Sequence, residues 1–543
     1  MSLTLLSIIY IITFTIHALR AITTNEYDWD IDQFMYFGNR LLNGELVGVT
    51  EFDDKLPILQ YLFAIPAHLK STSIWVLMTL LISIYASYLS YKLIVGLIYN
   101  SGIRVDLYKA KRIALFAATL YLCLIVCIFG SLNHINTICS SLNLIAIYNI
   151  YKATCKDCEN KRSHYIISAL SATVAISVRP YLLFPIIFTA IWGKARSTVS
   201  RKGIKSISIV KFVTKVLNFS MYWLLTILLF GAILNLTPYL LTGNLNSLFI
   251  TMKLNATDYI SHNIFERQYL NIGKNPIIIP FAMVMIALPI IRIIKGTQLK
   301  GIQNSEDFKT RFNLEQFDLD ILYFSILSPL LLEEAFLRRH FFAHYFNLFS
   351  PYLIISTSLL LAMFAKVEYL QNPRLRLAKA RNLIITIILI ISLITDKSIT
   401  SSIKHVLYGD GEYKKESLIV VSNFLSSKDD PSEYSFLFPE DNYYHWKLSQ
   451  SRHHFPQAAV YKNIRMGIFD KVINENPDLE FVYILPRQKD LCNTLKAKGP
   501  KLIFTKFNDF SYKCLSSSPE SYRLLKGENK LEELNLYVFQ KTS

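Results

Sequence analysis

The chain has 543 residues, of which 52% are hydrophobic and only 18% are charged, and its formal net charge is +17. This composition excludes an ordinary soluble enzyme, because several apolar runs reach the roughly 20 residues that a helix needs to cross a bilayer core. Lys and Arg cluster in short links between these runs, and alternate links hold few of them, which is the charge bias of cytoplasmic loops. We therefore expect a multi-pass protein of the lipid bilayer that binds no nucleic acid.

The apolar runs and basic links predict a polytopic α-helical membrane protein with about eleven transmembrane helices. The basic links are 104–112, 152–162, 194–215, 292–311 and 366–381. With these links in the cytoplasm, the expected spans are 2–22, 73–98, 111–129, 135–151, 164–178, 180–193, 216–236, 276–294, 318–334, 348–366 and 382–396. The loops 23–72, 237–275 and 335–347 then lie outside the cytoplasm, and the expected location is the plasma (inner) membrane. The first span is expected to be retained, because it lacks the basic start and cleavage site of a signal peptide.

Residues 1–396 are expected to form the transmembrane domain, and residues 397–543 an extracytoplasmic α/β domain. Long apolar runs end near residue 397, and shorter ones alternate with polar turns. They predict a helix at Glu412–Ser427 and strands at Tyr434–Phe438, Glu480–Leu485, Lys501–Thr505 and Leu534–Gln540. Cys492 and Cys514 are the only cysteines that an extracytoplasmic disulfide could join. Cys155 and Cys158 have no second cysteine pair, so zinc binding is not expected.

The first extracytoplasmic loop carries most of the candidate chemistry. From Asp28 to Tyr61 it contains five Asp and two Glu, a concentration of carboxylates that is costly beside hydrocarbon unless it has a role. Apolar residues at helical spacing predict an interfacial helix that ends at Gly44. A second helix is expected to begin near Asp53 and Asp54, with Pro57 in its first turn. Its apolar residues, Ile58, Leu59, Tyr61 and Leu62, are expected to face the bilayer.

Asp30 is the leading candidate for a general base, because a carboxylate beside an interfacial helix can take a proton from an incoming hydroxyl. Asp28 is a candidate for orienting the substrate. Asp32 has two interpretations: it caps the following helix, or it shares the catalytic role of Asp30. The two overlapping Asp-x-Asp units also match a short metal and nucleotide-sugar motif, but nucleotide sugars are not normally present outside the cytoplasm.

The order of residues in this loop resembles the first-loop motif of GT-C glycosyltransferases, most closely the bacterial branch of the protein O-mannosyltransferase and lipid A aminoarabinose transferase group. The matching residues are Asp30, Tyr36, Gly38, Arg40, Gly44, Asp53, Lys55, Pro57 and Tyr61. The resemblance implies an integral membrane enzyme that takes a sugar from a polyprenyl-phosphate carrier and inverts the anomeric carbon. It also implies that Asp30 is the base, that Lys55 lies near the donor phosphate, and that Asp53 and Asp54 orient sugar or base.

The loop departs from the family pattern at two positions. Ile31 stands where an acidic residue usually follows the Asp, and Leu56 replaces the first Pro of a Lys-Pro-Pro element. Relatives often carry another carboxylate at the next extracytoplasmic turn, where it joins in binding metal. Here that turn holds His134 and asparagines. No metal ligands and no cofactor are therefore assigned, although a divalent metal stays an open alternative.

A second group of candidates lies far along the chain. Arg338, Arg339, His344 and Tyr345 fall in a link expected outside the cytoplasm, where positive charge is unusual. The segment Arg339–Tyr352 resembles an Arg, His-Tyr, Pro element of the same superfamily, so these side chains are expected to stabilise the leaving phosphate. Snorkelling to lipid head groups is the alternative. Arg179, before Pro180, could likewise bind phosphate or anchor a short helix.

Together these features predict a glycosyltransferase that moves a hexosyl or pentosyl group from a polyprenyl-phosphate donor to a hydroxyl-bearing protein, lipid or envelope glycan. One alternative is a polytopic transporter or flippase, although the sequence has no internal duplication of the kind common in transporters. Another alternative is an O-antigen polymerase or ligase, which would not account for the pairing of an early acidic loop with a Lys-x-Pro helix.

Overall fold

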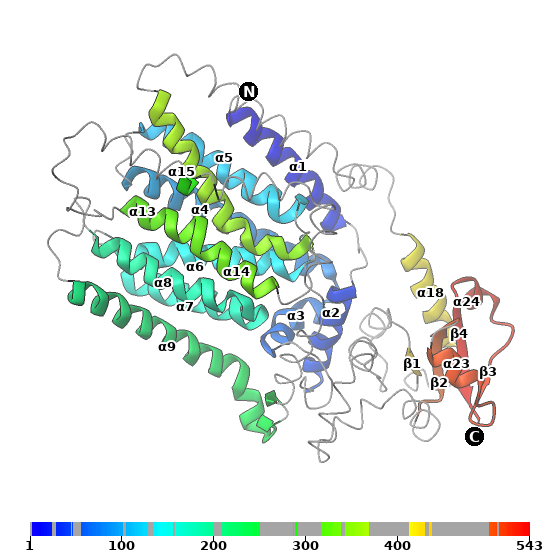
Figure 1. The fold of residues 1–543 in the computed structure, drawn as a ribbon. Helices are drawn as coiled ribbons and strands as arrows, with labels where there is room; N and C mark the ends of the chain where they lie inside the picture. The colour runs from blue at the N-terminus through cyan, green and yellow to red at the C-terminus, as the bar shows by residue number, and fades with distance from the viewer. Residues whose placement is uncertain are drawn as a thin grey trace, which may run out of the picture. The chain divides into compact units, whose positions relative to one another are not determined.

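The structure, a computed structural model, describes residues 3–23, 29–44, 46, 56–100, 105–128, 132, 134–155, 158–199, 209–246, 248–249, 286, 288–290, 316–337, 343–368, 412–428, 434–436, 499–507 and 510–542 (Figure 1). The chain divides into two compact units. The first comprises residues 1–21, 77–233 and 262–407, and the second comprises 22–76, 234–261 and 408–543.

The first unit is helical. Its main helices are α1 (Leu3–Thr23), α4 (Thr72–Asn100), α5 (Leu107–Cys123), α6 (Ile135–Thr154), α7 (Lys161–Val178), α8 (Leu183–Thr198), α9 (Ile209–Thr242), α13 (Gln316–Ile321), α14 (Ser328–Leu337) and α15 (Ser350–Glu368). Four short segments of other helical geometry join them: η1 (Leu124–Ile128), η2 (Pro180–Leu182), η3 (Leu322–Leu327) and η4 (Ala343–Phe349).

Five helices in the described part of the chain are long and apolar enough to cross a membrane. They are Leu3–Ile22, Thr72–Asn100, Leu107–Cys127, Val210–Thr242 and Phe346–Met363. This composition and length fit a helical membrane protein with several spans. The expected total of about eleven stays a prediction, because the spans at 276–294 and 382–396 lie largely or wholly outside the described residues.

The expected break at Arg179 and Pro180 is confirmed. Helix α7 ends at Val178, and Arg179 leaves the helical region with φ −134° and ψ 89°. Pro180 then begins the short turn η2. The physical reason is that proline has no N–H to donate to a continuing helix and restricts the residue before it to extended conformations.

Helix α6 is the most deeply buried helix of the first unit, and it packs against α7, α8, α15 and η4. Nearly every residue from Ile135 to Tyr151 is buried. It is also unusually polar, and neighbouring helices satisfy its side chains: the Ser141 hydroxyl bonds to that of Ser83 at 3.1 Å, and Asn143 Nδ2 donates to the Tyr352 hydroxyl at 3.0 Å. Such interhelical hydrogen bonds fix helix positions where the surroundings are apolar.

The second unit contains α2 (Trp29–Leu42) and α3 (Ile58–His68), together with a small mixed α/β part near the C-terminus. That part has α18 (Glu412–Ser426), β1 (Tyr434–Phe436), β2 (Leu502–Lys506), α23 (Phe510–Ser516), β3 (Tyr522–Leu524), α24 (Asn529–Glu533) and β4 (Leu536–Lys541). The strand order is β1-β2-β4-β3, with β1 parallel to β2 and the other neighbours antiparallel.

Alternating side chains of this sheet fill two cores. Leu502, Phe504 and Val538 pack with Val421 and Phe424 of α18, whereas residues of the opposite parity, Ile503 and Phe539, pack with Leu515 and Tyr522. The expected helix at Glu412–Ser427 and the expected strands at 434, 501 and 534 are confirmed within two residues. The expected strand at Glu480–Leu485 lies outside the described residues.

Candidate functional site

The acidic loop that the sequence singles out contains two closely packed helices, α2 and α3. A Cβ on Gly38 of α2 would lie 2.5 Å from the backbone carbonyl carbon of Phe63 on α3, so only glycine allows this approach. Phe34 and Phe63 contact each other at a ring-centroid distance of 5.4 Å, and Phe63 stacks on Trp75 at 4.0 Å. The motif glycine therefore has a structural role, which is to hold the two helices of the loop together.

The ends of these helices agree only partly with expectation. Gly44 ends α2, as predicted: it has φ +82°, a conformation that favours glycine, and its N–H donates to the Leu41 carbonyl. Helix α3 begins at Ile58, with Pro57 just before its first turn, so the prediction that it begins near Asp53 and Asp54 is wrong. The prediction that Ile58 and Leu59 face the bilayer is wrong, since both are buried. The reason is that α3 turns these residues toward the protein interior.

Asp30 and Asp32 both lie in the first turns of α2, because that helix begins at Trp29. The expectation that Asp32 caps the helix is therefore wrong: it lies inside the helix, three residues after its start. The Asp32 side chain is only 3% exposed. A carboxylate near a helix N-terminus is stabilised by the helix dipole, which offsets part of the cost of this burial.

Asn235 is a residue of this region that the sequence analysis missed. Its Oδ1 accepts a hydrogen bond of 3.3 Å from the N–H of Ile58, in the first turn of α3. The first N–H groups of a helix have no intrahelical partner, so Asn235 satisfies one of them. No local signal could have found this contact, because the two residues are 177 positions apart.

In the first unit, a buried polar cluster surrounds the N-terminus of α6. His134 precedes the helix, and its Nδ1 accepts a 3.1 Å hydrogen bond from the N–H of Asn136. Arg179, which is 5% exposed, donates from Nε to Asn136 Oδ1 at 2.5 Å. Asn347, from η4, donates to Thr137 Oγ1 at 3.1 Å. The turn before Pro180 and the segment η4 thus contact two consecutive residues at the start of α6, Asn136 and Thr137.

This cluster contains Arg179 and adjoins the second motif. The backbone of His344 and Tyr345 belongs to η4, the segment that also contains Asn347. A helix N-terminus with its free N–H groups and dipole favours anions, and a nearby guanidinium strengthens that preference. The arrangement can therefore stabilise negative charge. The sequence shows His134 and asparagines in this turn only as the absence of a metal-binding carboxylate, and it gives no signal for the contact of Asn347.

The remaining candidates lie outside the described residues. These are Asp28, Asp53, Asp54, Lys55, Arg338 and Arg339, together with the side chains of Asp30, His344 and Tyr345. Within the described part of the chain, no group of three or more His, Cys, Asp or Glu side chains is arranged to hold a metal ion. Cys514 is disulfide-bonded, whereas Cys155 and Cys158 are free.

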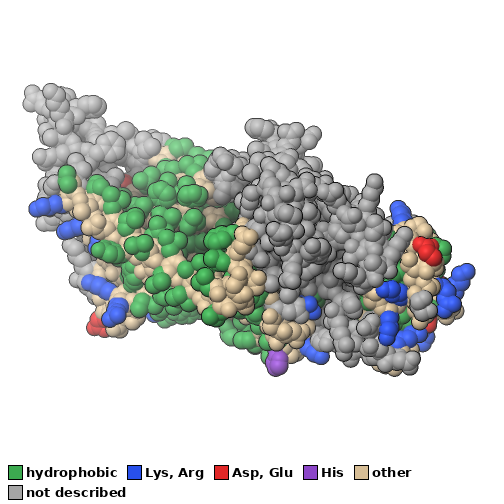
Figure 2. Space-filling model, turned by 90° about the horizontal axis from the view of Figure 1, so that it is seen from below, with side chains coloured by type: hydrophobic (Ala, Val, Ile, Leu, Met, Phe, Trp, Pro, Cys, Tyr) green, Lys and Arg blue, Asp and Glu red, His purple; other side chains and the backbone are tan. Residues whose placement is uncertain are grey.

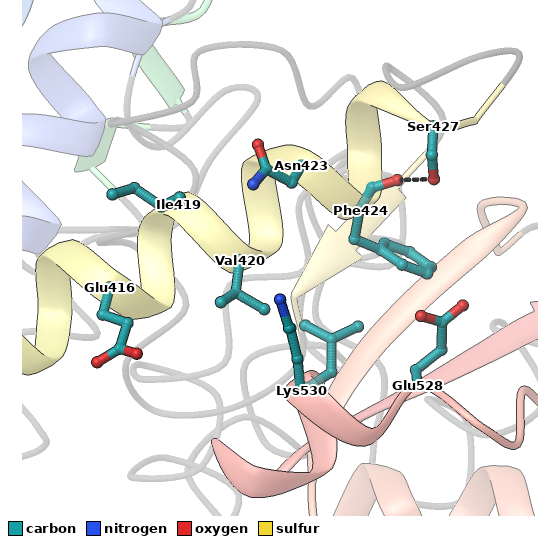
Figure 3. Close-up of a pocket in the computed structure, with 9 residues that line it drawn as sticks. Glu416, Ile419, Val420, Asn423, Phe424, Ser427, Glu528 and Lys530 are labelled. Atoms are coloured by element: carbon teal, nitrogen blue, oxygen red, sulfur yellow. Dashed lines mark hydrogen bonds between the residues drawn. The ribbon is translucent and has the colours of Figure 1, made fainter.

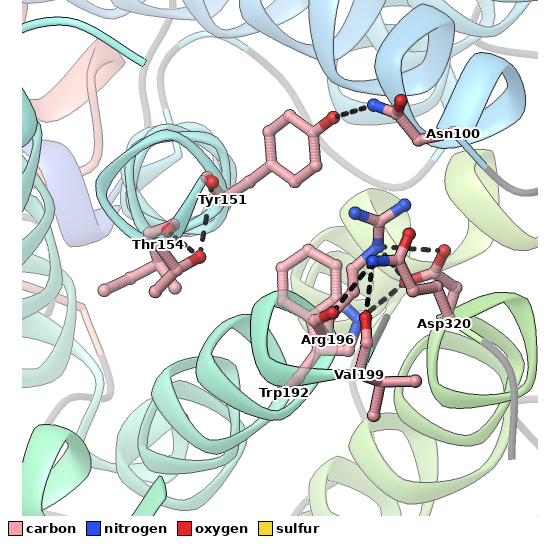
Figure 4. Close-up of polar contacts among 9 residues, drawn as sticks. Asn100, Tyr151, Thr154, Trp192, Arg196, Val199 and Asp320 are labelled. Atoms are coloured by element: carbon pink, nitrogen blue, oxygen red, sulfur yellow. Dashed lines mark hydrogen bonds and ion pairs between the residues drawn. The ribbon is translucent and has the colours of Figure 1, made fainter. Parts of the chain in front are cut away.

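A second buried polar cluster lies at the other end of α6, where the helix reaches Tyr151 (Figure 4). Arg196 of α8 donates from Nε to both oxygens of Asp320, at 2.8 and 3.2 Å, and Trp192 Nε1 donates to Asp320 at 2.9 Å. The Arg196 guanidinium also lies 5.2 Å from the Tyr151 ring centroid, and Asn100 donates to the Tyr151 hydroxyl. This cluster joins four helices, α4, α6, α8 and α13, and its role is to stabilise their packing.

A cavity of about 590 Å³ lies between α18 and α24 in the C-terminal part (Figure 3). Its lining is mixed: Ile419, Val420, Phe424 and Leu531 are apolar, and Glu416, Asn423, Ser427, Glu528 and Lys530 are polar. None of these residues belongs to the motifs that the sequence singles out. Carboxylate, amide, hydroxyl and ammonium groups beside an apolar wall can bind a molecule rich in hydroxyl groups.

No protein-family model and no curated protein matches the sequence. The solved structures that are similar to this chain include two of ArnT from Cupriavidus metallidurans. The crystal structure of ArnT bound to undecaprenyl phosphate has a TM-score of 0.48 and 12% identity, covering 99% of this chain and 98% of that one. The apo structure has a TM-score of 0.43 and 10% identity, covering 98% and 97%.

Proposed function

We propose that this chain is a membrane glycosyltransferase that moves a sugar from a polyprenyl-phosphate donor to a hydroxyl-bearing acceptor outside the cytoplasm. The observation that carries the proposal is the buried polar cluster at the N-terminus of α6. Polar and charged side chains within a membrane bundle are costly and usually functional. Here Arg179 is 5% exposed and Asn347 is fully buried. Asn347 belongs to η4, which lies within the motif segment Arg339–Tyr352. The sequence makes this segment and Arg179 separate candidates for phosphate binding.

In the proposed reaction, the Asp30 carboxylate takes the proton of the acceptor hydroxyl, with Asp32 as the second candidate for this role. The hydroxyl oxygen attacks the anomeric carbon from the face opposite the leaving group, and the bond from that carbon to the phosphate oxygen breaks. The products are the inverted glycoside and a polyprenyl phosphate that carries an additional negative charge. Asp28, Asp53 and Asp54 orient the sugar or the base.

Positive groups would stabilise the charge that develops on the leaving phosphate. Arg179 lies beside a helix N-terminus, which adds a fixed positive potential. Its companions in this role are Lys55, Arg338, Arg339, His344 and Tyr345. The proposed role of these residues is independent of metal, because it uses the guanidinium, ammonium and imidazole groups of the chain.

The C-terminal part is proposed to lie outside the cytoplasm and to contribute to acceptor choice. The disulfide of Cys514 supports this location, because disulfides persist in oxidising compartments. The mixed lining of the cavity between α18 and α24 supports contact with a hydroxyl-rich acceptor.

The substitution Asp30→Asn tests the proposal, because it keeps the size of the side chain but removes the proton acceptor. We expect transfer of label from a polyprenyl-phosphate sugar to envelope material to fall by at least about a hundredfold in membranes that contain the variant. The exposed residue Glu533 provides the matched control, and Glu533→Gln should transfer label at the wild-type rate. Equal transfer by Asp30→Asn and wild type, at equal protein levels, would remove Asp30 from the mechanism.

A further inference from the structure

Three lysines lie near the start of α7, the end of α8 and the start of α9: Lys161, Lys194 and Lys215. The ammonium of Lys194 lies 5.4 Å from the ring centroid of Phe219 on α9. Tyr165 of α7 contacts the same ring at 5.9 Å, and its hydroxyl bonds to Thr226 Oγ1 at 3.0 Å. These contacts fix the three helix ends relative to one another.

The lysines are close enough for their charges to interact. Partial burial, followed by the charges of Lys215 and Lys161, lowers the pKa of Lys194. Among the described residues, the ion pairs that carboxylates form are Asp106 with Lys109 and Asp320 with Arg196, so neither Lys194 nor Lys215 has a carboxylate partner there. Like charges that are held together in this way favour binding of an anion.

An apolar surface continues from the lysines along the bundle. On α9, Leu217, Met221 and Leu225 are each more than half exposed, and on α7 Ile166 and Leu170 are exposed. Helix α9 is the least buried of the candidate spans, since only 17% of its 18-residue apolar stretch is buried. Figure 2 shows Lys and Arg side chains gathered at the left end of a broad hydrophobic surface. A cationic end and a long apolar face match the two parts of a phospholipid.

We propose that Lys194 and Lys215 hold the phosphate headgroup of an anionic phospholipid, with Lys161 adding to the local positive charge. The acyl chains of this lipid lie along the exposed faces of α7 and α9. A free phosphate ion would use the lysines alone and would leave the apolar faces uncovered, so the lipid is the favoured occupant. Zwitterionic lipids offer the same chains but no net negative charge. The site therefore selects lipids by headgroup charge, and it does not depend on transferase activity.

Native mass spectrometry of the full chain in detergent tests this site, with phosphatidylglycerol as the probe and phosphatidylcholine as the neutral comparison. Each lysine near a membrane surface contributes about a fivefold preference for anionic lipid, so Lys194→Gln with Lys215→Gln should weaken phosphatidylglycerol binding about 25-fold. The arginine variant of both positions keeps the charges and should retain binding. Millimolar inorganic phosphate should not displace the lipid.

The matched control removes two lysines from the start of α5 through Lys109→Gln with Lys111→Gln. This control should leave phosphatidylglycerol binding within about twofold of wild type, because binding depends on the cluster and not on net charge. An equal loss in both glutamine pairs would overturn the proposal. So would equal binding of phosphatidylcholine, a loss in the arginine variant, or displacement by free phosphate.

Discussion

At the scale of single residues, Arg179 is the charge that most needs a functional explanation. The Arg179 guanidinium is 5% exposed and stays charged, because arginine does not deprotonate in proteins. Burying this charge is costly unless hydrogen bonds satisfy it, and Asn136 accepts one of these bonds. A phosphate is an anion that a guanidinium binds through several hydrogen bonds at once. We propose a substrate-binding role for Arg179, and its contact with Asn136 of α6 supports this proposal.

Replacing Arg179 should lower turnover more than it weakens donor binding, because charge on the phosphate increases as the glycosidic bond breaks. For Arg179→Gln we expect kcat to fall about a hundredfold, with a smaller change in KM. Arg162 provides a control at the opposite, exposed end of the same helix, and Arg162→Gln should match wild type. Wild-type kinetics for Arg179→Gln would show that this residue only anchors the helix.

The pair of Arg196 and Asp320 makes a separate prediction about stability. Removing one member leaves the other buried without its counter-charge, which costs about 3–5 kcal/mol. Asp320→Asn should therefore lower the unfolding temperature markedly, whereas replacement of both residues by apolar ones, Arg196→Met with Asp320→Leu, should recover part of the loss. Thermal unfolding in detergent measures both. The exposed Glu159→Gln should change stability little, and an unchanged Asp320→Asn would contradict the assigned role in stabilising helix packing.

At the scale of elements, the packing of α2 on α3 depends on Gly38. The atoms that an added Cβ would meet belong to the backbone of Phe63 and Ala64, which cannot move aside as a flexible side chain could. Gly38→Ala should cost about 1–3 kcal/mol of stability and disturb transfer, because it pushes apart the helices of the acidic loop. Gly231, inside α9, has its nearest neighbour at 3.8 Å, so Gly231→Ala should be tolerated. Equal unfolding temperatures for the two variants would contradict this account.

Local chemistry made several elements predictable. Gly44 ends α2 because glycine adopts a positive φ at little cost. Pro180 begins a new turn because proline fixes its φ and has no N–H to continue the preceding helix. The start of α2 was predicted too late, since Asp32 suits a helix cap equally well and nothing local distinguishes a cap from a first-turn residue. The burial of Ile58 and Leu59 could not be predicted, because it depends on which face of α3 meets α2.

At the scale of the whole molecule, composition and charge bias were sufficient for the class of protein, because bilayer thickness constrains sequence directly. Contacts between residues far apart in the sequence could not be predicted. Asn347 lies 210 residues from Thr137, and Asp320 lies 124 residues from Arg196, so neither polar cluster leaves a local pattern. The motif resemblance nevertheless selected the segment of η4, and the charge pattern selected Arg179. The fold brings both to the same end of α6.

The most direct test of the central claim is donor consumption by the purified protein. The folded chain in detergent is incubated with a panel of radiolabelled polyprenyl-phosphate sugars, and label released or transferred is separated from the lipid phase. The account predicts that one class of sugar is released by wild type and not by Asp30→Asn. Failure of the folded wild-type protein to consume any member of the panel would contradict it.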